Sequence, residues 1–185
     1  MVSLKTSIFF FDVFLLFVLL LGAVWSIASP DRRIWPPSRR VSWQYRITWV
    51  CFYLIFAMNA FLFVFDWDSW IFHGLHRLIV GIPIALLGAL LVTWGIITLG
   101  AKNTSGLSDR FVTNGPYTFT RNPQYLGDNI LFFGLSIIAN SELLWITHIL
   151  LILIFLITPL TEEPWLEEQY GQEYIHYKQT TSRFL

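Results

Sequence analysis

The sequence predicts an all-α integral membrane protein with about five transmembrane helices, of which the last two form a tight hairpin. Of its 185 residues, 55% are hydrophobic and only 13% are charged, so the chain is far more apolar than an average soluble domain. The apolar residues also gather into long runs separated by short polar stretches. We therefore expect residues 1–185 to form a single membrane domain.

Charge and cysteine content exclude several classes of protein. The formal net charge is zero, so no overall field attracts nucleic acid, and we expect no nucleic-acid partner. The single cysteine, Cys51, excludes an internal disulfide framework. No cluster of His, Cys, Asp and Glu has the spacing of metal ligands, so we predict no metal.

Three apolar runs in residues 1–99 predict three transmembrane helices. They cover about residues 7–28, 47–65 and 78–99, each near the roughly 20 residues that cross a bilayer at 1.5 Å per residue. The first is longer than the core of a signal peptide, roughly 7 to 15 residues, which favours a retained helix. Small residues in the third run, such as Gly81, Gly88 and Gly95, allow a neighbouring helix to approach closely.

The second half of the chain reads as a helical hairpin followed by a polar tail. Apolar runs at 126–139 and 143–160 flank the polar residues 140–142, and the first arm is too short to span comfortably. We expect the second arm to end at Thr161–Glu163. The C-terminal tail, from Glu163 onward, has an apolar face at helical spacing, which predicts a helix on the membrane surface. That face consists of Leu166, Tyr170, Tyr174 and Tyr177.

The distribution of basic residues predicts the orientation. With five segments, ten of the twelve Lys and Arg fall on the same side as the 100–125 connection and the C-terminal tail, and only Lys5 and Arg77 fall on the other. Because cytoplasmic loops carry an excess of Lys and Arg, we predict a multi-pass protein whose site faces the cytoplasm.

The stretch GPYTFTRNPQYLG, residues 115–127, has the features of a functional loop. Pro116 fixes its own φ, and Pro123 restricts the residue before it, so the loop can hold side chains still. Arg121 is its one permanent cation, and a guanidinium presents a planar fork suited to carboxylate or phosphate. The alternative is that Arg121 simply reaches lipid headgroups at the membrane edge.

Glu162 and Glu163 form a carboxylate pair at the end of the last apolar run. They are either the solvated end of a helix or part of a site. Acidic residues interact unfavourably with the C-terminal end of a helix dipole, which favours a functional reason, such as hydrogen bonding to a cationic or hydroxylated ligand. We expect the pair to meet the loop at 115–127.

These elements together resemble a known family. The loop GPYTFTRNPQYLG, an apolar hairpin and then EEPWLEEQYGQEYIHYKQTTSRF resemble the isoprenylcysteine carboxyl methyltransferases and, more broadly, the membrane methyltransferases that include phospholipid methyltransferases. The family pattern is G-[PV]-Y-x-x-x-R-H-P-x-Y-x-G, then E-E, then a tail with G-x-E-Y. The resemblance begins near Asp109, and the first three helices match only as hydrophobic segments. It implies an enzyme that uses S-adenosylmethionine, with residues 100–185 as its catalytic region.

The resemblance implies two sets of site residues. We predict that Arg121 and Glu163 are catalytic, with Arg121 orienting the carboxylate of the acceptor or of the cofactor. The predicted cofactor-binding residues are Asp109, Arg110, Phe111, Val112, Tyr117, Asn122, Pro123, Gln124, Tyr125 and Glu162.

The chain departs from the family pattern at two places. Asn122 stands where the pattern has histidine, and asparagine hydrogen-bonds but does not titrate near neutral pH. The arginine that eukaryotic members carry before the E-E pair is also missing, because Thr158–Thr161 contains none. A carboxylate acceptor still suits the site, because it is already an anionic nucleophile near neutral pH.

The predicted acceptor is lipophilic, namely the carboxylate of a prenylated cysteine or analogue, as a small molecule or at a protein C-terminus, bound among membrane lipids. One alternative is a phospholipid N-methyltransferase. Another is an NADPH-dependent membrane reductase of the sterol type, whose C-terminal loop and tail are similar. A lipid-binding relative without catalytic activity is the third.

Overall fold

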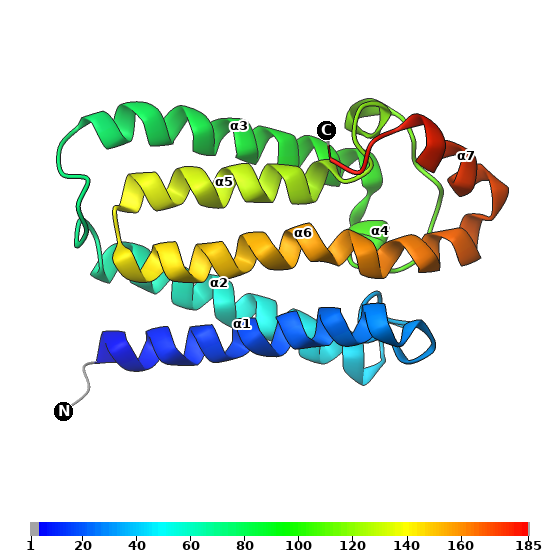
Figure 1. The fold of residues 1–185 in the computed structure, drawn as a ribbon, viewed down its shortest axis with the longest axis horizontal. Coiled ribbons are helices and arrows are strands. Elements are labelled where there is room, and N and C mark those ends of the chain that lie inside the picture. Colours follow the sequence, from blue (N-terminus) through cyan, green and yellow to red (C-terminus); the bar gives the residue numbers. More distant parts are fainter. Residues whose placement is uncertain (1–3, 185) are drawn as a thin grey trace.

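Five long helices run side by side in the computed structural model, which describes residues 4–184 (Figure 1). The structure is 76% helix, with no strand among the described residues. The five are α1 (Leu4–Ala28), α2 (Trp43–Phe65), α3 (His76–Leu99), α5 (Pro123–Ala139) and α6 (Glu142–Tyr170). Within the described part of the chain, all but α5 are long and apolar enough to cross a membrane. The predicted all-α membrane fold is confirmed, with the 17-residue α5 as its short member.

The remaining helical elements lie at one end of the bundle. They are η1 (Pro30–Arg32), α4 (Ala101–Thr104), η2 (Gly115–Thr118) and α7 (Gln172–Thr180). Figure 1 shows α4 and α7 at the end of the bundle opposite the start of α1. The helices alternate in direction, so the 29–42 connection, the 100–122 connection and the C-terminal tail share this end, as the sequence predicted.

The predicted hairpin between α5 and α6 has a two-residue turn. Asn140 takes the left-handed conformation, with φ 47°, which asparagine tolerates better than most residues. Ser141 is the N-cap of α6, and its hydroxyl accepts a hydrogen bond of 3.1 Å from the amide of Leu144. The Asn140 side chain donates to Asp68 at 2.7 Å, which ties the turn to the 66–75 connection.

The expected end of α6 at Thr161–Glu163 is wrong. The helix continues to Tyr170 through Pro159 and Pro164. The two acids therefore lie inside a helix, and each has partners from other elements: Trp35 and Tyr125 donate to Glu162, and Arg183 donates to Glu163. These hydrogen bonds stabilise the two carboxylates, so the helix can continue past acidic residues at which the sequence predicted its end.

Helices α3 and α5 approach closely because glycines line their interface. A Cβ on Gly88 would lie 2.3 Å from the backbone nitrogen of Leu131, and one on Gly127 would lie 2.7 Å from the nitrogen of Val92. Both distances are below any van der Waals contact, so only glycine fits. The sequence predicted this use of Gly88, as expected where packing replaces the hydrophobic drive between membrane helices.

A chain of buried polar groups links α1, α2 and α6. The Asn59 amide donates to Asp12 at 2.8 Å, and its oxygen accepts from the Thr147 hydroxyl at 2.7 Å. Such bonds between helices are worth roughly 0.6 kcal/mol each in a membrane. Together with the packing of α6 on α1, they position α6, which carries the Glu162–Glu163 pair.

Gly88→Ala should destabilise the protein by about 1 to 3 kcal/mol, because the added methyl group meets backbone that cannot move aside. The measurement is thermal unfolding in detergent. Gly22→Ala in α1 is the matched control, since its Cβ would sit 3.6 Å from Ile34, an ordinary contact. Equal melting temperatures for the two variants would contradict the interpretation of the interface.

Candidate functional site

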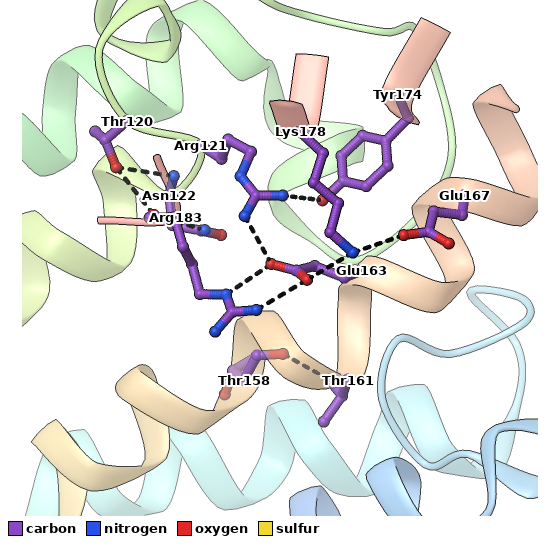
Figure 2. Close-up of polar contacts among 10 residues, drawn as sticks. All are labelled: Thr120, Arg121, Asn122, Thr158, Thr161, Glu163, Glu167, Tyr174, Lys178 and Arg183. Atoms are coloured by element: carbon purple, nitrogen blue, oxygen red, sulfur yellow. Dashed lines mark hydrogen bonds and ion pairs between the residues drawn. The ribbon is translucent and has the colours of Figure 1, made fainter. Parts of the chain in front are cut away.

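Four charged side chains meet where the loop, α6 and the C-terminal tail come together (Figure 2). Glu163 is the centre of the group. It accepts from Arg183 at 2.7 and 3.0 Å, lies 3.2 Å from the guanidinium of Arg121 and 3.3 Å from the ammonium of Lys178. The loop at 115–127 and the carboxylate pair therefore meet, as predicted.

Arg121 is almost fully buried, with 8% of its side chain exposed. One terminal nitrogen donates to the hydroxyl of Tyr174 at 3.4 Å, and another faces Glu163. Its Nε is buried without a partner in residues 4–184. A buried donor without an acceptor is costly, so this N–H is available for an anionic group of a ligand.

The end of the C-terminal tail is bound along the loop. The backbone amide of Arg121 donates to Ser182 at 2.9 Å. The Thr120 hydroxyl and the Asn122 side chain donate to the carbonyl of Arg183 at 3.1 and 3.0 Å. Asn122, at the position of the family histidine, therefore fastens the tail through its amide, a role that needs no titratable group.

Glu162 points in a different direction from Glu163, as neighbours on a helix do, and is held by two donors. The indole nitrogen of Trp35 donates at 2.7 Å and the hydroxyl of Tyr125 at 2.5 Å, both to the same carboxylate oxygen. Trp35 comes from the connection between α1 and α2, 127 residues away in sequence. This contribution carries no local signal and was missed by the sequence prediction.

A pocket lined by charged and aromatic side chains, which we call the polar pocket, lies between these groups. Of the twelve predicted site residues, the structure brings ten to its lining: Arg110, Phe111, Val112, Tyr117, Arg121, Asn122, Gln124, Tyr125, Glu162 and Glu163. Asp109 instead pairs with Lys102 at the surface, at 3.2 Å. Pro123 is buried as the first residue of α5. The prediction missed lining residues from α3 and α4, including Leu99, Asn103 and Thr104.

The aromatic face of the C-terminal tail covers the polar pocket, so this face is not free to contact the membrane. The position of the tail at the membrane surface stays a prediction. Tyr174 and Tyr177 are buried, and Leu166 and Tyr170 also line the pocket. The ring of Phe111 stacks on Tyr170 with centroids 5.0 Å apart. Helical spacing identified the apolar face correctly but not its partner.

The tyrosines around the pocket remain neutral hydrogen-bonding groups. Burial raises the pKa of Tyr177 to about 12. Burial also raises the pKa of Tyr117, with a further rise from the nearby Glu162, and burial raises that of Tyr174. The Tyr177 hydroxyl donates to the carbonyl of Tyr117 at 2.6 Å, which joins the tail to the loop.

An apolar cavity of about 490 Å³ adjoins the polar pocket. Helices α2 and α3 hardly touch within residues 4–184, and residues from both line the cavity together with others from α1, α5 and α6. Several of its apolar lining residues are more than a third exposed, so the cavity opens on the lipid-facing surface. They are Val18, Trp43, Ile47, Phe56 and Ile96.

Tyr125 and Thr104 line both the polar pocket and the apolar cavity. Trp35 is in the cavity wall and Glu162 in the pocket wall, so the Trp35–Glu162 and Tyr125–Glu162 hydrogen bonds form the boundary between them. This arrangement defines a class of protein: an integral membrane protein with a polar pocket and an apolar cavity on the two sides of one hydrogen-bonded wall.

The comparison with known families identifies the group within that class. The phospholipid methyltransferase family matches residues 76–173, more than half of the chain, and the chain belongs to this family. It is a membrane methyltransferase. Searches of curated proteins and of solved structures found no match. Among residues 4–184, no group of three or more His, Cys, Asp or Glu is placed to hold a metal ion.

Glu163→Gln should cost about 3 kcal/mol or more of stability, because it leaves the buried Arg121 without a full counter-charge. It should also release the C-terminal tail to limited proteolysis. Glu168→Gln is the control, since Glu168 is 55% exposed in its 3.4 Å pair with Arg33, and such pairs contribute at most about 1 kcal/mol. A tail equally protected in both variants would contradict the role of Glu163.

Proposed function

We propose that this protein transfers a methyl group from S-adenosylmethionine to a lipophilic acceptor at the junction of the two cavities. The observation that carries the proposal is the shared wall, since Tyr125 lines both the polar pocket and the apolar cavity. A water-soluble donor suits the first and a lipid suits the second. The family match supports a methyltransferase over the NADPH-dependent reductase.

The residues of the polar pocket fit the chemistry of S-adenosylmethionine. The Nε of Arg121, which has no partner within residues 4–184, suits the carboxylate of the cofactor. Glu162, whose bonds to Trp35 and Tyr125 use one carboxylate oxygen, has a second oxygen for the ammonium or a ribose hydroxyl. When bound, the cofactor supplies an electrophilic methyl group on a sulfonium.

The polar pocket encloses about 100 Å³, less than the roughly 300 to 1,000 Å³ of typical ligand sites. It must therefore widen when a nucleoside enters. We expect the pocket to widen at the boundary formed by Tyr125 and Glu162, because breaking their hydrogen bond joins the polar pocket to the apolar cavity. The catalytic contribution of the chain is then positioning, which can lower a barrier by about 7 to 11 kcal/mol.

Two acceptor classes fit a lipophilic cavity. The carboxylate of a prenylated cysteine or analogue is the one that the sequence resemblance implied. The amine of a phospholipid is favoured by the family that the chain matches. The two differ in charge, because the first acceptor is an anion and the second a cation.

We further propose that the site faces the cytoplasm. Ten of the twelve Lys and Arg lie toward the end of the bundle that holds the polar pocket, which is the distribution of cytoplasmic ends. The soluble cofactor would then enter from the cytosol, and residues 100–185 would form the catalytic region.

Purified protein should bind labelled S-adenosylmethionine, and Glu162→Gln should weaken this binding about tenfold or more, as expected when a hydrogen bond to a charged group is lost. Equilibrium dialysis measures both. Glu173→Gln, an exposed tail carboxylate, is the matched control. Binding of NADPH in place of S-adenosylmethionine would contradict the proposed function.

Arg121→Ala should reduce methyl transfer about 100-fold, the size of effect expected when a reactant is misplaced. The fold should persist, because Glu163 keeps Arg183 and Lys178 as partners. The assay follows labelled methyl transfer to lipid, with thermal unfolding alongside. Arg40→Ala, in the exposed connection after α1, should behave as wild type; near-normal turnover by Arg121→Ala would remove Arg121 from the mechanism.

A further inference from the structure

Asp128 is an acidic side chain placed in an apolar environment. It lies on α5, one turn after Tyr125, and lines the apolar cavity. Its carboxyl makes no hydrogen bond or ion pair within residues 4–184, although it is half-buried. The described residues lining the cavity include no Lys, Arg or His. An acid within a membrane helix is costly unless it pairs, and is a functional candidate by default.

We propose that Asp128 binds the ammonium group of an amine-bearing lipid in the apolar cavity and accepts a proton from it. The inference rests on the proposed function and names the residue that selects the acceptor. An anionic Asp128 attracts a cation and repels the carboxylate of a prenylated cysteine. Its position next to Tyr125 puts the bound amine at the boundary with the polar pocket.

Methylation of an amine requires a proton acceptor. An ammonium nitrogen has no lone pair, so it must first give a proton to the Asp128 carboxylate. The nitrogen lone pair then forms a bond to the methyl carbon while the methyl–sulfur bond breaks and its electron pair stays on sulfur. The products are the N-methylammonium lipid and a neutral thioether, and the proton on Asp128 passes to water.

The other candidates for this role are already engaged or cannot titrate. Asn122, at the family's histidine position, is an amide and holds the tail. Glu162 accepts from two donors. Glu163 is paired with three cations, which stabilise its charge and make it a weak base. Among the acidic residues that line the two cavities in the described chain, Asp128 alone is unpaired.

The test compares two lipids that differ only in the ammonium. Dioleoylphosphatidylethanolamine and its N-acetyl derivative have the same chains and phosphate, and dissociation constants in detergent are measured by native mass spectrometry. Wild type should prefer the amine by about 10- to 100-fold, the worth of a hydrogen bond to a charged group. Asp128→Asn should lose this preference, and Asp128→Glu should keep part of it. Asp31→Asn, exposed and remote in sequence, should keep all of it.

If Asp128→Asn still prefers the amine lipid, the inference is overturned. It is also overturned if wild type shows no preference for the amine lipid. The second outcome needs no variant, so the test remains decisive even if Asp128→Asn fails to fold. Binding of S-adenosylmethionine is measured separately on the same samples. Its absence in wild type rejects the proposed function, whereas the lipid comparison still decides the role of Asp128. Preferential binding of farnesylcysteine by wild type would also overturn the inference.

Discussion

The structure depends on the two adjacent carboxylates of α6. Because Glu162 and Glu163 are neighbours on a helix, they point in different directions and bind different parts of the chain. Glu162 joins the connection after α1 to α5 through Trp35 and Tyr125. Glu163 joins the loop to the C-terminal tail through Arg121 and Arg183. The pair therefore closes the polar end of a bundle whose helices are held elsewhere by apolar packing, by close glycine contacts and by the buried Asp12–Asn59–Thr147 hydrogen bonds.

The hydrogen bonds of Glu162 also divide the site into two compartments. The Tyr125–Glu162 bond is both a structural contact and the boundary between a polar pocket and an apolar cavity. The cavity exists because α2 and α3 hardly touch, while α3 is held tightly on α5 by glycine contacts such as Gly88. Close packing on one side of α3 thus leaves room for a lipid on the other.

Residue types alone predicted the loop and the carboxylate pair, whereas most of the predicted cofactor-binding residues came from the family resemblance. The loop at 115–127 and the Glu162–Glu163 pair each contain groups too polar for a membrane edge without a partner, so their meeting was predictable. The continuation of α6 to Tyr170 was not, because proline and acidic residues are local signals of a helix end. Trp35 was not predictable either, since nothing near it in the sequence indicates contact with Glu162.

The sequence by itself determined the five long apolar segments, the hairpin turn near residues 140–142 and the gathering of polar segments at one end. Each follows from local rules, since a chain in a bilayer must satisfy its backbone within helices and cross at fixed length. Only the tertiary structure decided that the tail covers the polar pocket and that Asp128 lines an apolar cavity without a partner among residues 4–184. Helical spacing shows which residues share a face, but what that face meets depends on packing between distant segments.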